Sequence, residues 1–81
     1  MISCEHHDYI EIACTFRFPI KLTLRSGRTV FGVARDTQFN SDRDECIELE
    51  NNGQANLVVL EGIAAVEVCI KNPHFQTIRF T

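Results

Sequence analysis

The sequence predicts a single small domain over residues 1–81, mainly β, with one N-terminal helix and a strongly bent antiparallel barrel or sandwich of five or six strands. Residues 20–24 alternate between apolar and polar side chains, which is the period of a strand with one buried face. A Ser26-Gly27 turn then leads directly into a second apolar strand. Gly32 lies inside that strand, where a glycine is typical of a bulge or a bend. A bent hairpin of this kind favours a small curled sheet.

A helix is expected before this hairpin, over residues 8–16. Its apolar residues recur at the spacing of one helical face, and they are Tyr9, Ile10, Ile12, Ala13, Cys14 and Phe16. Asp8 and Glu11 have the spacing of a capping box, with Asp8 at the N-cap. Pro19 ends the segment, because the residue before a proline avoids helical backbone angles.

The rest of the chain is predicted as short strands joined by turns. A polar loop over residues 37–45 precedes a half-buried strand at 46–50, and Asn51–Gly53 has the composition of a tight hairpin turn. The continuous apolar run 57–60 predicts a strand buried on both faces. The later elements are a break at 61–62, a strand at 63–70, a turn at 71–74 and an edge strand at 75–80.

Composition limits the classes of function. The chain has 11 acidic and 8 basic residues and a net charge of −3, whereas a nucleic-acid-binding domain normally has a basic surplus. Its apolar runs are too short to cross a bilayer, and the N-terminus lacks the pattern of a secretion signal. The 4 cysteines are therefore expected to be reduced and mostly packed, in a cytoplasmic protein.

Residues that carry catalysis or bind metal ions form no recognisable pattern. Cys4 and His7 have the spacing of a zinc-ligand pair, but the second pair that a structural zinc site needs is missing. Cys14 lies among apolar helical residues, so packing explains it. Gly27 and Gly32 belong to a turn and a strand, which predicts no phosphate loop. We expect no catalytic residue, no metal ion, no cofactor and no small-molecule substrate.

The acidic residues near the N-terminus have two interpretations. Glu5, Asp8 and Glu11 follow one another at intervals of three, so all three can project from one edge of a helix. In the structural interpretation they stabilise the helix N-terminus, by about 0.3–1 kcal/mol per group. In the functional interpretation they form an anionic ridge that docks on a basic groove and competes with a nucleic acid for it. Tyr9 is either an aromatic anchor beside this ridge or a core residue.

Basic residues gather in one third of the chain, and they are Arg17, Lys21, Arg25, Arg28 and Arg35. A phosphate-binding face is one interpretation of this cluster. On alternating strands, such residues more often form the solvated face of a half-buried sheet, and we favour that interpretation.

The segment 22–36 resembles the first conserved motif of Sm-like proteins, with glycines at 27 and 32 and a closing Asp36. That resemblance implies an N-terminal helix followed by a five-stranded, strongly bent, barrel-like sheet. The segment 57–68 has the strand pattern of the second Sm motif, but it lacks the basic and asparagine residues with which Sm-like rings hold RNA.

Nearly the whole chain resembles the Rho-binding antiterminator family (Rof), which consists of small Sm-like bacterial proteins. The residues that carry this resemblance are Cys4, Asp8, Ile10-Glu11-Ile12-Ala13-Cys14, the strand at 20–24, the turn at Gly27, and Pro73. The resemblance implies inhibition of the hexameric termination factor Rho, because the family covers the RNA-binding surface of Rho's N-terminal domain with an acidic helix.

Carried over by position, the resemblance implies that Glu5, Asp8 and Glu11 contact Rho, with His7 standing where the family tends to have tyrosine. A family loop that also approaches Rho corresponds to residues 40–45 and is more acidic here. The resemblance therefore also implies contacts with Rho from Asn40, Asp42, Asp44 and Glu45.

The expected function is inhibition of Rho-dependent transcription termination by occlusion of Rho's primary RNA-binding site, with no direct nucleic-acid binding. The alternative is an RNA-binding Sm-like module that uses the basic face of the first hairpin, with Arg25, Arg28 and Arg35.

Overall fold

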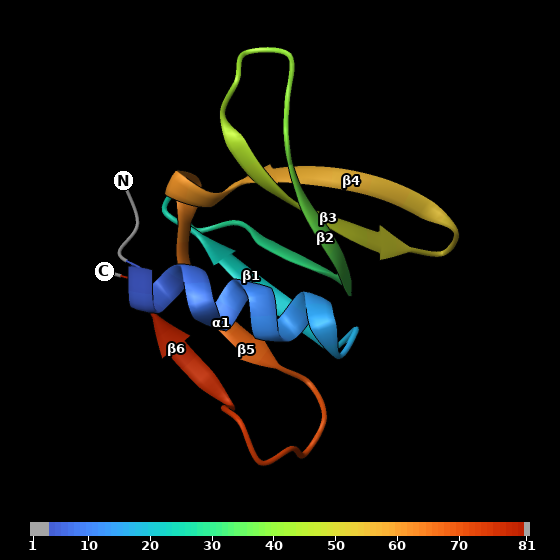
Figure 1. Ribbon diagram of the computed structural model, residues 1–81, viewed down its shortest axis with the longest axis vertical. Coiled ribbons are helices and arrows are strands. Elements are labelled where there is room, and N and C mark those ends of the chain that lie inside the picture. The colour runs from blue at the N-terminus through green and yellow to red at the C-terminus, as the bar shows by residue number, and fades with distance from the viewer. Residues whose placement is uncertain (1–3, 81) are drawn as a thin grey trace.

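The computed structural model describes residues 4–80 as one helix, six strands and a short 3₁₀ turn (Figure 1). In chain order these are α1 (Cys4–Thr15), β1 (Pro19–Leu24), β2 (Thr29–Phe39), β3 (Glu45–Asn51), β4 (Gln54–Val59), η1 (Leu60–Gly62), β5 (Ile63–Val68) and β6 (Thr77–Arg79). The strands form one antiparallel sheet in the order β4-β3-β2-β1-β5-β6. The predicted mainly β domain with one N-terminal helix is therefore confirmed.

The helix begins earlier than the sequence predicted. It starts at Cys4 within the described residues, so Asp8 is an interior helical residue and its prediction as the N-cap was wrong. The additional turn makes tertiary contacts that local sequence does not reveal. The His6 ring stacks on Phe80 with 4.5 Å between ring centroids, and His7 contacts β3.

The C-terminal end of α1 is closed by backbone contacts. Arg17 adopts a left-handed φ of 53°, and the Phe18 N–H donates to the Ala13 carbonyl over 3.0 Å. Pro19 then begins β1. The sequence predicted that the helical segment ends before this proline, and α1 ends at Thr15.

The core lies between α1 and the face of the sheet that α1 covers (Figure 1). The helix contributes Ile10, Ala13 and Cys14, and the rest of the chain contributes Phe18, Ile20, Leu22, Ala34, Ile47, Leu49, Leu60, Ile63, Val66, Val68, Phe75 and Phe80. The predicted apolar face of the helix is confirmed at its centre. At its edge, Phe16 is 52% exposed.

Strand β2 belongs to both halves of the sheet. Its residues 29–33 pair with β1 and its residues 33–39 pair with β3. The register shifts between Ala34 and Asp36, so the predicted irregularity is confirmed but lies at Arg35 rather than at Gly32. Gly32 has a different role, because an added Cβ there would lie only 2.9 Å from the Cβ of Leu49 on β3.

Two strand predictions need correction. Because β2 continues to Phe39, the polar loop predicted at 37–45 shortens to residues 40–44. The segment 57–60 is not buried on both faces, because β4 is the last strand in the sheet order and Leu57 is 44% exposed. The predicted hairpin turn is confirmed, with positive φ at Asn52 and Gly53.

All four cysteines are free, with Cys14 and Cys46 buried and Cys4 and Cys69 exposed. Among residues 4–80, no helix has the length and apolar character needed to cross a membrane.

Candidate functional site

The predicted acidic residues lie on the outer surface of α1. Burial of Ile10 and the neighbouring core residues fixes the orientation of the helix, so Glu5, Asp8 and Glu11 are all exposed. At about 100° per residue, three positions spaced by three spread over roughly 120° of the helix surface. We call these three side chains the acidic ridge.

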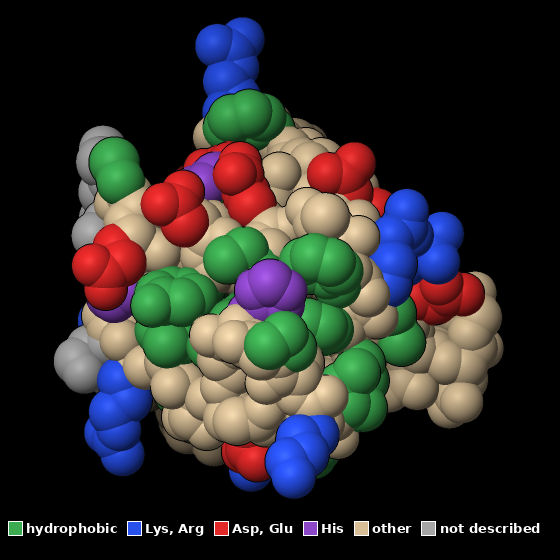
Figure 2. Space-filling view, turned by 60° about the horizontal axis from the view of Figure 1, so that its bottom comes forward, with side chains coloured by type: hydrophobic (Ala, Val, Ile, Leu, Met, Phe, Trp, Pro, Cys, Tyr) green, Lys and Arg blue, Asp and Glu red, His purple; other side chains and the backbone are tan. Residues whose placement is uncertain are grey.

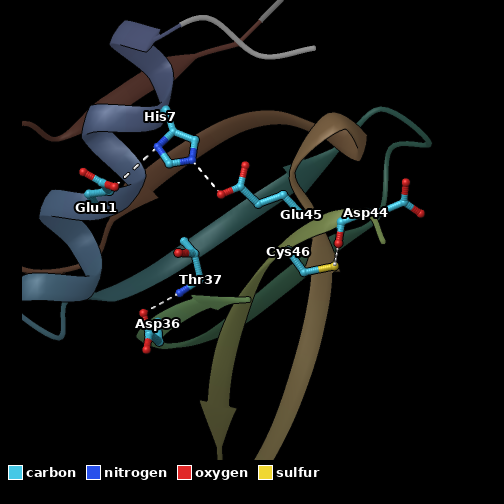
Figure 3. A network of polar contacts seen from close by, with 7 residues as sticks. All are labelled: His7, Glu11, Asp36, Thr37, Asp44, Glu45 and Cys46. Carbon is cyan, nitrogen blue, oxygen red and sulfur yellow. Dashed lines mark hydrogen bonds and ion pairs between the residues drawn. The ribbon is translucent and has the colours of Figure 1, made fainter. Parts of the chain in front are cut away.

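His7 connects this ridge to the sheet. Its Nε2 lies 2.8 Å from Oε2 of Glu45 at the start of β3, and its Nδ1 lies 3.6 Å from Oε1 of Glu11 (Figure 3). The hydrogen bond to Glu45 raises the pKa of His7 above its usual 6.5; desolvation opposes this, and the charges of Glu45, Glu11 and Asp8 add to it. The structure therefore brings together three of the predicted site residues, His7, Glu11 and Glu45.

The loop before β3 is shaped by Asn40. Its side-chain Oδ1 accepts hydrogen bonds from the backbone N–H groups of Asp42 and Asp44, both at 2.9 Å. Arg43 adopts a positive φ of 65° within the same loop, and the thiol of Cys46 donates to the Asp44 carbonyl over 3.4 Å (Figure 3). Asn40 is thus a loop-forming residue, whereas the carboxylates of Asp42 and Asp44 are exposed.

A groove of about 400 Å³ lies between α1 and β2. Its lining residues are Glu11, Cys14, Thr15, Arg17, Arg35, Asp36 and Thr37. A hydrogen bond orients the side chain of Asp36, whose Oδ1 accepts the Thr37 N–H over 2.8 Å (Figure 3). Burial, reinforced by the charge of Asp36, raises the pKa of the Cys14 thiol to about 11. This thiol is protonated at neutral pH, which agrees with its interpretation as a packed side chain.

Sequence reasoning did not place Asp36 near the helix. In the sequence, Asp36 is recognisable only as the closing residue of a strand motif, and no local pattern predicts its position beside the helix. Asp36 and Glu11 line the same groove as Arg17 and Arg35, so the groove holds charges of both signs.

Two residues of the basic cluster make side-chain contacts, and a third lies opposite an acidic residue in the sheet. Nη1 of Arg35 lies 2.9 Å from Oε1 of Glu50, and Nε of Arg25 donates to the Glu61 carbonyl over 2.7 Å. Lys21 is paired in register with Glu67 on one side. The two side-chain contacts, and the position of Lys21 opposite Glu67 in the sheet, agree with the interpretation of the basic cluster as a solvated sheet face.

Two aromatic side chains of the helical segment contact residues 74 and 75, which follow β5. Tyr9 makes an edge contact with Phe75 at 5.0 Å and is half-buried, so it packs against the core. Phe16 stacks on His74 with 4.7 Å between ring centroids. On this side of the molecule, hydrophobic side chains surround a histidine and acidic side chains lie beside them (Figure 2).

Comparison with known proteins finds a matching family model and a similar solved structure. A family model described as "Modulator of Rho-dependent transcription termination (ROF)" matches residues 1–80. A solved structure titled "YaeO bound to Magnesium from Vibrio cholerae O395" is similar, with 43% sequence identity and a TM-score of 0.88. The match covers 91% of this chain and 96% of that chain. No curated protein matches. The family resemblance indicated by the sequence is confirmed.

Proposed function

Because the chain belongs to the ROF family of modulators of Rho-dependent transcription termination, we propose that it inhibits termination by binding Rho over the primary RNA-binding site of Rho's N-terminal domain. The acidic ridge on α1 occupies the place that RNA would take. The protein acts in the bacterial cytoplasm, without catalysis and without direct contact to nucleic acid.

The observation that carries this proposal is the outward placement of Glu5, Asp8 and Glu11 on a helix whose opposite face is buried. A surface that binds RNA is basic, because neutralising phosphates contributes a large share of the affinity. Carboxylates on a rigid helix are complementary to such a surface and compete with RNA for the same cations. Since complementary charges act mainly on association rate and specificity, the binding weakens as salt rises.

The loop at 40–44 extends the proposed surface. The contact between Glu45 and His7 ties the end of this loop to α1 (Figure 3). Asp42 and Asp44 are exposed, and we assign them direct contacts with Rho. Asn40 contributes by holding the loop in shape through its two side-chain hydrogen bonds.

A competition experiment tests the proposal. Labelled pyrimidine-rich single-stranded RNA is bound to Rho and titrated with this protein at low and at moderate salt. We expect the protein to release the RNA, and to release less of it at the higher salt. If the RNA stays on Rho at both salt concentrations, the proposed function is wrong.

The double substitution Asp8→Lys with Glu11→Lys should abolish release without lowering the melting temperature much, because both side chains are exposed. Glu67→Lys is a control for charge reversal at another site, since Glu67 is an exposed carboxylate on β5 that points away from the helix-covered face, opposite Lys21. Normal RNA release by the double variant would overturn the assignment of α1 as the docking surface.

The alternative is direct RNA binding by the first hairpin and the strand that follows. It predicts that labelled RNA binds this protein without Rho, and that alanine at Arg25, Arg28 and Arg35 removes the binding. The ion pair between Arg35 and Glu50 disfavours this alternative, because it already neutralises one of the three cations.

A further inference from the structure

Within residues 4–80, the two rings that stack on Phe16 lie on one side of it. Its centroid lies 4.7 Å from that of His74, with 25° between the planes, and 5.6 Å from that of Phe18, with 19° between the planes. The Phe18 and His74 centroids are only 6.2 Å apart, which is too close for rings on opposite faces of Phe16. Both therefore support the same side, and Phe16 remains 52% exposed. We call these three rings the Phe16 platform.

The platform is held in place before any partner binds. Phe18 is buried, and the Phe16 N–H donates to the Ile12 carbonyl over 3.1 Å, which continues the helical backbone. The loop that presents His74 is braced by Asn72, whose Oδ1 accepts the N–H groups of His74 and Phe75 at 2.8 and 3.1 Å. A rigid aromatic surface loses little conformational entropy on binding, which favours affinity.

The platform lies within reach of a partner docked on the acidic ridge. Asp8, Ile12 and Phe16 follow one another at intervals of four, so they share one side of the helix, and Asp8 and Phe16 are about 12 Å apart along its axis. A standard interface buries about 800 Å² per partner, which corresponds to a circular patch of roughly 16 Å radius. A partner centred on Asp8 therefore also covers Phe16.

Charge indicates which group stacks there. The exposed face of an aromatic ring attracts planar cations, and arginine stacks on it better than other side chains. A nucleobase would also stack, but it would bring phosphates next to Glu5 and Asp8 in a chain with a net charge of −3. An arginine from a basic surface is attracted by the same carboxylates.

We infer that the Phe16 platform is the apolar half of the Rho-docking surface and receives the side chain of an arginine from Rho's basic RNA-binding face. This inference rests on the proposed function. The carboxylates steer the encounter and the platform retards dissociation, because buried aromatic side chains contribute mainly to affinity, and affinity differences lie mostly in the dissociation rate.

The test measures the affinity of Rho for the protein and for three variants at two salt concentrations. Phe16→Ala should weaken binding about tenfold, with the salt dependence unchanged. Phe16→Leu keeps apolar area but has no ring face, so it should weaken binding nearly as much. Phe31→Ala is the matched control, because Phe31 is 53% exposed but pairs in register with Lys21, on the sheet face away from α1.

The outcomes distinguish the platform from the proposed function. Normal affinity of Phe16→Ala, together with loss of binding by the Asp8→Lys, Glu11→Lys variant, overturns the platform and leaves the proposed function standing. Wild-type affinity of Phe16→Leu overturns arginine stacking. RNA binding by the free protein that Phe16→Ala removes would assign the platform to a nucleobase instead. No binding of Rho by the wild type overturns both proposals.

Discussion

Nε2 of His7 lies 2.8 Å from Oε2 of Glu45, so a polar contact between residues 38 positions apart joins α1 to β3. The contact lies between the acidic ridge and the loop at 40–44. Because it favours the charged form of His7, it links the stability of this surface to pH.

The first prediction concerns this link. A pKa raised in the folded state means that the stabilisation is fully present below the unfolded value of 6.5 and is lost as pH rises through the higher folded pKa. Melting temperatures measured between about pH 5.5 and 8.5 should fall with pH more steeply in the wild type than in His7→Gln. Glu45→Gln should flatten the curve as well. Three curves of equal slope would contradict the assignment.

The second prediction concerns the close approach of β2 to β3 at Gly32. Gly32→Ala should lower the free energy of unfolding by about 1–3 kcal/mol, because its Cβ would lie 2.9 Å from the Leu49 Cβ. Gly62→Ala serves as the control in urea unfolding, since a Cβ there would meet no described atom within 4 Å outside the adjoining backbone. We expect a change within about 0.5 kcal/mol for the control. Equal effects at both sites would show that the close approach does not matter.

The third prediction compares two leucines. Leu22 on β1 is fully buried, so Leu22→Ala should cost about 2–5 kcal/mol of unfolding free energy. Leu57 on the edge strand is 44% exposed, so Leu57→Ala should cost clearly less in the same denaturation assay. A larger loss at Leu57 would mean that β4 is covered in solution.

The fourth prediction concerns thiol reactivity. With a thiol-specific disulfide reagent at neutral pH, Cys4 and Cys69 should react quickly because they are exposed. Cys14 and Cys46 should react only on unfolding, since both are buried and the pKa of the Cys14 thiol is raised to about 11. Single Cys→Ser variants assign each rate. A fast reaction at Cys14 would show that α1 opens readily.

Local patterns in the sequence were sufficient for much of the fold. Alternation over residues 20–24 predicted β1, and the Asn-Gly pair predicted the β3–β4 turn, because both signals depend on near neighbours only. The start of α1 was missed because its first turn packs against Phe80 and Glu45, which are distant in sequence. The burial of β4 was overestimated, because an apolar run does not reveal that its strand lies at a sheet edge.

For the candidate site, helical spacing predicted that the acidic ridge would project from one edge of the helix, and the structure places all three residues on the exposed surface. The contact of His7 with Glu45 and the stack of Phe16 on His74 were not predictable, because each joins segments that only the folded sheet brings together. Their contribution to Rho binding remains a prediction.

The sheet order also determines how the chain folds. The pairs β1–β2, β2–β3, β3–β4 and β5–β6 join strands that are neighbours in the chain, whereas β1 pairs with β5 from Ile20↔Val68 to Leu24↔Ile63. Hairpins close short loops and form early, but the β1–β5 pairing closes most of the chain and loses more entropy first. We therefore expect this pairing to set the folding rate. A nascent chain on the ribosome cannot complete its core until β5 has emerged, although α1 and the first three hairpins precede it.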